Sequence, residues 1–177
     1  SSFRDYSFTV KNILTPKQTI NSAIPCLSAG DTLSIRGGSY NENIDANAFS
    51  PFPTGTSWGN VVTIASYANE TATVVGQINM PDAYLQYIVF DRLVIDVPGT
   101  MQGGISWGSS GAHHLRFQNG EVKNAGQCCA CVGGGADRAN IYIFGAFHEI
   151  VGNNIHHSHC SHGLYLASAD NLLIANN

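Results

Sequence analysis

The sequence predicts an all-β solenoid, in which short strands are wound into stacked coils around one apolar column. The main observation is a repeat: an apolar-x-apolar segment, a few polar or Gly/Asn residues and another apolar residue recur about every 25 residues. The anchors of this repeat are Ile64, Phe90, Phe117, Ile150 and Leu173, separated by 26, 27, 33 and 23 residues. Such a unit is too short for a strand–helix–strand crossover, so coils of short strands are expected.

Composition is the second observation. Charged residues make up 11% of the chain, against about 25% in an average globular protein. A surface of amides, hydroxyls and glycine backbone suits strands and tight turns better than helices. The net charge is −4, from 8 basic and 12 acidic residues without a basic run, so no nucleic-acid partner is expected. No apolar stretch approaches the roughly 18 residues of a membrane span, so no membrane association is expected.

A second strand is expected in each unit, because Gly104–Trp107, Ala130–Gly133 and Gly163–Leu166 alternate apolar with small or polar residues. In this alignment Cys131 points inward, in line with Ile105 and Leu164. A β-sandwich would instead need hairpin turns, and Asn119-Gly120 is the only Asn-Gly dipeptide in the chain.

A short helix is expected to cover the start of the stack. Thr15-Pro16-Lys17-Gln18 has the form of a capping box with Pro at the first helical position. The helix would carry Ile20, Ala23, Ile24 and Leu27. We expect one domain over residues 1–177, with residues 1–30 as the cap and residues 31–177 as about five to six coils. The sequence stops part-way through a coil, which predicts a C-terminal continuation or end-to-end self-association.

Two segments resemble a known superfamily. "QTINSAIPCLSAGDTLSIRGGSYNENI" is similar to the entry segment of right-handed parallel β-helix proteins of the pectin lyase-like superfamily, and "HEIVGNNIHHSHCSHGLYLASADNLLIANN" resembles their generic repeat. The resemblance covers most of residues 8–177. It implies a right-handed parallel β-helix, and it leaves activity open, because the superfamily includes polysaccharide lyases, hydrolases, epimerases and non-catalytic proteins.

Register then predicts which side chains are neighbours, because equivalent positions in adjacent coils lie about 4.8 Å apart. With Leu173 as the last anchor, Arg116 should lie beside Glu149. Asp96, Lys123 and His156 should form a column of carboxylate, ammonium and imidazole, which is either a group capable of proton transfer or a solvated ladder of mixed charges. Asparagine columns are expected from Asn153 with Asn176 and from Asn154 with Asn177.

Histidine and cysteine gather in the stretch His156-His157-Ser158-His159-Cys160-Ser161-His162. Imidazole and thiolate suit zinc or copper, but the spacing matches no established metal motif, so polar corner residues are favoured over a metal site. A disulfide is expected between Cys160 and Cys128 or its neighbour Cys129. Five cysteines and the single sequon Asn69-Glu70-Thr71 predict a secreted protein with a glycan on Asn69.

Two functions follow from this reading. The first is a lyase or epimerase acting on an acidic polysaccharide, which needs a cation at the uronate carboxylate, a base and an acid. Its candidate catalytic residues are Lys123, His156, Asp96, Arg116 and Glu149, with Arg92 as a further cation and Asp91, Asp96 or Glu149 as groups that would orient the base or hold calcium. The chain lacks the aspartate clusters of the calcium-dependent members. The alternative is a non-catalytic carbohydrate-binding or structural module, with Trp58, Tyr67 and Tyr84 stacking on sugars and Trp107 in the core.

Overall fold

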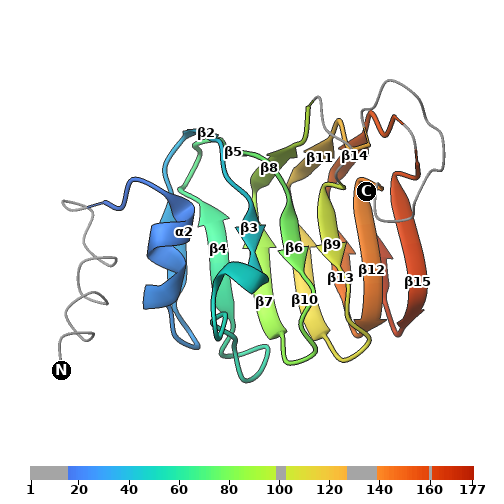
Figure 1. The fold of residues 1–177 in the computed structure, drawn as a ribbon, viewed down its shortest axis with the longest axis horizontal. Coiled ribbons are helices and arrows are strands. Elements are labelled where there is room, and N and C mark those ends of the chain that lie inside the picture. The colour runs from blue at the N-terminus through green and yellow to red at the C-terminus, as the bar shows by residue number, and fades with distance from the viewer. Residues whose placement is uncertain (1–15, 99–102, 127–138, 160) are drawn as a thin grey trace.

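The protein is mostly β, with parallel strands in curled sheets (Figure 1). The computed structural model describes residues 16–98, 103–126, 139–159 and 161–177. Among these, every pairing between named strands is parallel, and the antiparallel pairing is limited to an isolated bridge between Ser57 and Asn60. The hairpins that a β-sandwich requires are therefore not present in the described part of the chain.

Successive strands fall into three rows, and the chain visits the rows in turn. Row one contains β1 (Thr32–Ile35), β4 (Val62–Ser66), β7 (Gln86–Asp91), β10 (His113–Gln118), β13 (Glu149–Val151) and β16 (Leu173–Ala175). Row two contains β2 (Gly38–Tyr40), β5 (Ala72–Val75), β8 (Leu93–Asp96), β11 (Glu121–Lys123) and β14 (Asn154–His156). Row three contains β3 (Ile44–Asp45), β6 (Ile78–Met80), β9 (Ile105–Trp107), β12 (Ile141–Ala146) and β15 (Leu164–Asp170).

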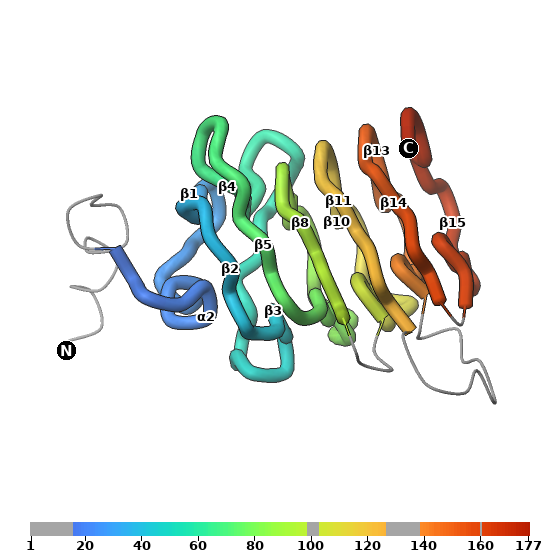
Figure 2. The backbone as a smooth tube through the Cα atoms, turned by 90° about the horizontal axis from the view of Figure 1, so that it is seen from above, coloured from blue at the N-terminus to red at the C-terminus, as the bar shows by residue number. Residues whose placement is uncertain are grey.

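Rows one and three join through β10 and β12 into an 11-stranded sheet, and row two is a separate 5-stranded sheet. We call one strand from each row, taken in chain order, a layer. Figure 2 shows the layers following one another from the blue N-terminal end to the red C-terminal end. Each layer therefore contacts mainly the layer before it and the layer after it.

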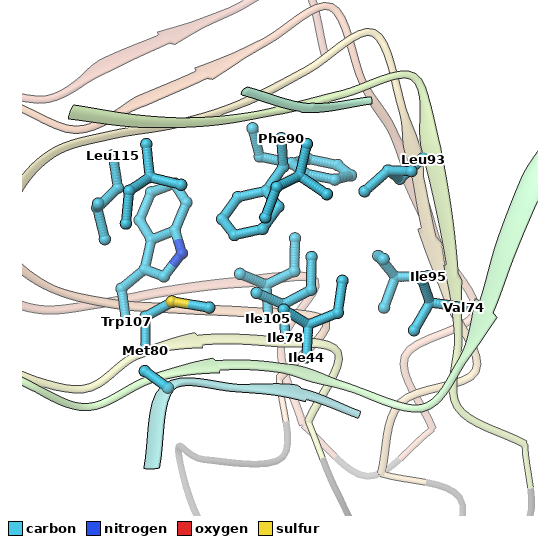
Figure 3. Close-up of a cluster of buried hydrophobic side chains, with 14 of the residues drawn as sticks. Ile44, Val74, Ile78, Met80, Phe90, Leu93, Ile95, Ile105, Trp107 and Leu115 are labelled. Carbon is cyan, nitrogen blue, oxygen red and sulfur yellow. The ribbon is translucent and has the colours of Figure 1, made fainter. Parts of the chain in front are cut away.

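The apolar core lies between the three rows and is built from vertical columns of equivalent side chains (Figure 3). In row three, Ile44, Ile78 and Ile105 are aligned and fully buried. In row one, Phe90 and Phe117 are aligned and fully buried. Strands such as β5 and β8 alternate buried and outward residues, as a strand buried on one face requires. The indole of Trp107 is fully buried, which confirms its expected place in the core.

A short helix covers the first layer, but it begins later than the sequence predicts. Helix α2 (Ile20–Ala23) continues into the 3-10 turn η1 (Ile24–Cys26). Its N-cap is Thr19, whose hydroxyl accepts from the backbone N–H of Ser22. The carboxylate of Glu42 accepts the next free donors, from the N–H groups of Ile20 at 2.8 Å and Asn21 at 2.9 Å. The predicted start at Pro16 was wrong because Thr19 is the N-cap, and Glu42, distant in sequence, accepts the first free N–H groups of the helix. Thr15 lies outside the described residues.

Most of the predicted register is confirmed. Ile64, Phe90, Phe117 and Ile150 are successive partners in row one. The last anchor was wrong by one residue, since Ile150 pairs with Ile174 and Glu149 with Leu173. The run Leu172-Leu173-Ile174 is apolar at every position, so it carries no alternation that could fix the register. As a consequence, Asn177 rather than Asn176 lies next to Asn153. The predicted pairing of Asn154 with Asn177 was therefore also wrong.

The predicted alignment of Ala130–Gly133 with the row-three strands was also wrong. The partners of Ile105, Ser106 and Trp107 are Ile141, Tyr142 and Ile143 of β12, which in turn pair with β15. Ile141 therefore holds the inward position assigned to Cys131. Cys131 itself and the predicted disulfide between Cys128 or Cys129 and Cys160 lie outside the described residues. No helix in the described part of the chain is long and apolar enough to cross a membrane.

Candidate functional site

The predicted column of Asp96, Lys123 and His156 is confirmed. Lys123 of β11 pairs with Asp96 of β8 on one side and with His156 of β14 on the other. All three side chains lie on the outer face of row two and are partly exposed. Asp96 does not bond directly to Lys123 but accepts a hydrogen bond from the amide of Asn124 at 2.7 Å.

The residue that joins this group is Glu121, which the sequence reading missed. Its Oε1 lies 2.8 Å from Lys123 Nζ and 3.0 Å from His156 Nε2. Glu121 precedes Lys123 by two positions on β11, so both side chains point to the same face of the row. That two-residue spacing was the available signal. We call Glu121, Lys123 and His156 the Glu121 cluster.

Electrostatics set the protonation states in the Glu121 cluster. The hydrogen bond from Lys123 is the main cause that holds the pKa of the Glu121 carboxyl below its usual value. The same hydrogen bond raises the pKa of Lys123, with a smaller contribution from the charge of Asp96. Lys123 therefore stays a cation and Glu121 an anion near neutral pH. A lysine with a raised pKa is a poor general base, so the remaining candidate base in the cluster is His156.

The other predicted catalytic pair, Arg116 and Glu149, lies on row one, away from the Glu121 cluster. The Arg116 guanidinium contacts Glu149 Oε2 through Nε and NH2, both at 2.7 Å, as the register predicts. Both side chains are partly exposed, so the pair stabilises the fold by at most about 1 kcal/mol. The structure thus divides the five predicted catalytic residues between two rows, and it does not bring them into one site.

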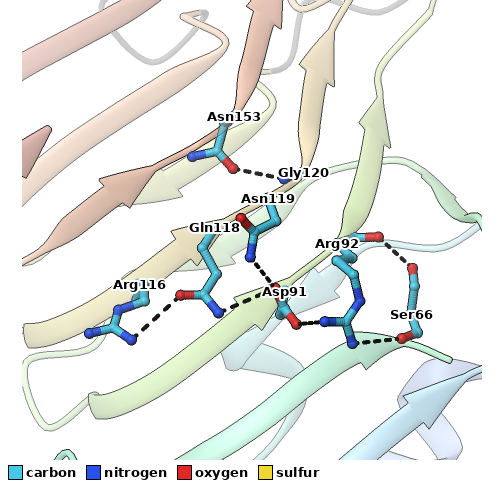
Figure 4. Close-up of polar contacts among 8 residues, drawn as sticks. All are labelled: Ser66, Asp91, Arg92, Arg116, Gln118, Asn119, Gly120 and Asn153. Carbon is cyan, nitrogen blue, oxygen red and sulfur yellow. Dashed lines mark hydrogen bonds and ion pairs between the residues drawn. The ribbon is translucent and has the colours of Figure 1, made fainter. Parts of the chain in front are cut away.

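The corner between rows one and two carries a network of polar side chains (Figure 4). The buried carboxylate of Asp91 accepts from Gln118 at 3.2 Å and from Asn119 at 2.9 Å, and it pairs with Arg92. Arg92 also donates to the backbone carbonyl of Ser66 at 3.2 Å. Asp91 is thus fully engaged by protein groups, which makes it a structural residue of the corner.

An open groove with a volume of about 440 Å³ follows the same corner across four layers. Its polar side chains are those of Asn69, Glu70, Thr71, Arg92, Asn119, Glu121 and Asn154. Each charged group of this lining is already paired: Glu70 with Arg36 at 2.6 Å, Arg92 with Asp91, and Glu121 with Lys123 and His156. The groove therefore presents amides and compensated charges at successive layers.

Comparison with protein-family models, curated proteins and solved structures finds no match to this chain. Function must therefore be argued from the geometry alone.

Two of the three aromatic side chains expected to stack on sugars have one ring face covered, whereas Tyr84 is 45% exposed and its hydroxyl accepts a hydrogen bond from the Phe52 N–H at 2.9 Å. Trp58 and Tyr67 are each 38% exposed, but the guanidinium of Arg116 lies 4.3 Å from the centre of the Trp58 ring and that of Arg36 lies 5.1 Å from the Tyr67 ring. These cation–π contacts cover a ring face that a sugar would otherwise use. A neighbouring stack formed by Tyr87, His114 and Phe147 has ring centres 4.6 and 5.0 Å apart, so its inner faces cover one another.

The residues do not fit a calcium site. Among the described residues, no group of three or more His, Cys, Asp or Glu side chains could hold a metal ion. The carboxylates proposed for calcium are engaged elsewhere: Asp91 by amides and Arg92, Asp96 by Asn124, and Glu149 by Arg116. Calcium prefers six to eight oxygen ligands, which these separated carboxylates do not supply.

Proposed function

We propose that this protein is a secreted right-handed parallel β-helix of the pectin lyase-like kind that binds polysaccharide in the groove between rows one and two. The observation that carries the proposal is the polar lining, which spans four layers and offers an amide or a charged group at each. A linear polymer lying along the stack would meet similar hydrogen-bonding groups at steps of about 4.8 Å, the spacing of adjacent strands. Hydroxyl groups both donate and accept, so they match this mixed lining.

The pairing of charges in the groove favours a neutral glycan. A uronate carboxylate needs a cation that is not already compensated, whereas Arg92 is paired with Asp91, and Lys123 at the edge of the groove is paired with Glu121. Glu70 and Glu121 are compensated in the same way, so the groove offers a polyanion no free counter-charge. A neutral, hydroxyl-rich glycan does not need one.

The proposal is tested by replacing Asn154, which lines the groove and is exposed. Loss of one or two hydrogen bonds to sugar should weaken binding by roughly two- to tenfold in Asn154→Ala. Affinity electrophoresis in gels containing a neutral or an acidic polysaccharide measures the effect. Asn41→Ala is the matched control, because Asn41 is exposed in the segment between β2 and β3 and does not line the groove. Equal retardation of both variants and the unmodified chain would contradict a binding site in the groove.

Asn69 needs separate treatment in this experiment. It is exposed in the turn between β4 and β5 and also lines the groove, so an N-linked glycan on it would enter the proposed binding site. Binding is therefore compared on protein carrying Asn69→Gln and on the unmodified chain. An intact mass shows directly whether Asn69 is glycosylated.

A lyase or epimerase acting on an acidic glycan is the second candidate, favoured by the Glu121 cluster. Glu121 orients the His156 ring, and Lys123 supplies a cation nearby. In elimination, His156 would take the C5 proton while the C4–O bond breaks, a double bond forms between C4 and C5, and solvent water protonates the departing oxygen. Incubation with polyuronates, followed by absorbance of the unsaturated product, tests the lyase reaction; His156→Gln should abolish it.

A further inference from the structure

Two adjacent histidines at the end of β14 turn the same ring nitrogen toward each other. The His156 and His157 rings are nearly perpendicular, with centres 4.6 Å apart, and their Nδ1 atoms are in direct contact. His157 has a positive φ of 52°, which turns its side chain back toward His156. The two nitrogens cannot both carry a proton in this arrangement, so at least one presents a bare lone pair.

The hydrogen bond to Glu121 determines which ring nitrogen of neutral His156 carries no proton. Its Oε1 accepts from His156 Nε2 at 3.0 Å, which places the ring proton of neutral His156 on Nε2 and leaves Nδ1 unprotonated. A carboxylate that holds the far nitrogen of an imidazole is the usual outer partner of a metal-binding histidine, because it fixes the ring and increases the basicity of the other nitrogen. The described residues thus provide a preset nitrogen donor beside a second imidazole.

We infer that His156 and His157 bind a divalent late transition-metal ion through their Nδ1 atoms, with Glu121 as the positioning residue. Imidazole nitrogens suit copper, nickel and zinc, and copper(II) binds most tightly in the usual order of affinities. Hard cations such as calcium and magnesium prefer oxygen donors and are not expected here. The remaining coordination positions fall to water, because the described residues contain no third convergent ligand.

The site needs only a small rearrangement to admit the ion. An ion bound to both Nδ1 atoms through metal–nitrogen bonds of about 2.0–2.1 Å must fit between them. The two atoms must therefore move apart from their present direct contact. His157 is exposed, so its ring can turn outward into solvent, whereas His156 stays held by Glu121. An ion on His156 Nδ1 would also occupy the nitrogen that a general base would use. Metal binding and the lyase reaction therefore exclude each other at His156. The metal site is also separate from the proposed polysaccharide groove, because neither His156 nor His157 lines it.

Isothermal titration of the full chain with copper(II), zinc(II) and calcium chloride tests the inference. We expect one copper site per chain, weaker zinc binding and no calcium binding. His157→Ala should reduce copper affinity at least about tenfold, since one of two protein ligands is lost, and Glu121→Ala should reduce it by about 10- to 100-fold. Electron paramagnetic resonance of the copper complex should show coupling to imidazole nitrogen that weakens in His157→Ala.

His162→Ala is the matched control, because His162 lies in the same turn, is exposed and contacts Ser161 instead. Its copper affinity should equal that of the unmodified chain. Unchanged affinity in His157→Ala, or an equal loss in His162→Ala, would overturn the assignment to His156 and His157. Circular dichroism of each variant confirms that the fold is retained, which the exposure of both replaced histidines favours.

Discussion

Asn153→Ala is expected to lower the free energy of unfolding by about 3 kcal/mol, the sum of lost bonds and stranded backbone groups. Asn153 is 4% exposed. Its Oδ1 accepts from the Gly120 N–H at 2.9 Å, and its Nδ2 donates to the Phe117 carbonyl and to Asn177 Oδ1, both at 3.0 Å. Alanine would remove the partner of the Gly120 N–H, which is part-buried, and of the buried Phe117 carbonyl, and a buried polar group without its partner costs more than the bond itself.

Urea unfolding measures this effect, provided that the dependence of the free energy on denaturant is unchanged. Asn154→Ala is the matched control, because the neighbouring asparagine is exposed and the same atoms are removed. It should change stability by no more than about 0.5 kcal/mol. Similar losses in the two variants would show that the amide network of Asn153 does not stabilise the fold.

His148 should make the protein sensitive to acid. The ring is 1% exposed and packs against Trp107, with ring centres 4.9 Å apart. Its Nδ1 accepts from the Leu115 N–H at 3.1 Å, so Nε2 carries the proton and donates to the Phe144 carbonyl at 2.9 Å. Burial lowers the pKa of His148 to about 4, and the nearby His113 and His114 contribute in the same direction.

Unfolding at acidic pH takes up a proton at His148, and this sets the direction in which stability changes with pH. The unfolded chain, with a histidine pKa near the usual value of about 6.5, binds more protons than the folded chain, so stability increases with pH. The part of the free energy of unfolding that depends on neutral His148 is present above about pH 6.5 and is lost as the pH falls toward 4. This part amounts to about 3 kcal/mol, of which about 2 kcal/mol is lost by pH 5.

Carboxylates also titrate in this range, so a comparison of variants isolates the histidine. In His148→Gln the amide can accept from Leu115 and donate to Phe144 without titrating. The stability difference between the unmodified chain and this variant should shift by about 2 kcal/mol between pH 7 and pH 5. His162→Gln, at an exposed histidine, should show no such shift. A pH-independent difference for His148→Gln would mean that His148 is not the acid-sensitive group.

How far the sequence predicts this structure depends on periodicity. Ile64, Phe117 and Ile150 could be aligned because their strands alternate apolar and polar residues, and Phe90 could be aligned because it lies 26 residues after Ile64 and 27 before Phe117. The same register predicted that Arg116 meets Glu149 and that Lys123 lies between Asp96 and His156. Register failed at Leu173, where three apolar residues in succession allow a shift by one. It also failed at Cys131, because the long interval between Phe117 and Ile150 signals an insertion without saying on which side of the strand it lies.

Contacts made at the corners and at the helix end were harder to predict than the register of the strands. Glu42 caps helix α2 and Asn177 reaches Asn153, and both pairings depend on how corners fold, which alternation does not describe. Glu121 could have been found, since it shares an outer face with Lys123. The nitrogen contact between His156 and His157 accompanies a left-handed backbone at His157, a conformation that only a few per cent of non-glycine residues adopt.

The contact of each layer mainly with its two neighbours has a consequence for how the molecule loosens. Opening an inner layer breaks pairing on two sides, whereas opening the outermost layer breaks pairing on one. β7 and β10 belong to inner layers, because each pairs with a strand on both sides. Their amide hydrogens should therefore exchange more slowly than those of the turns that join the rows.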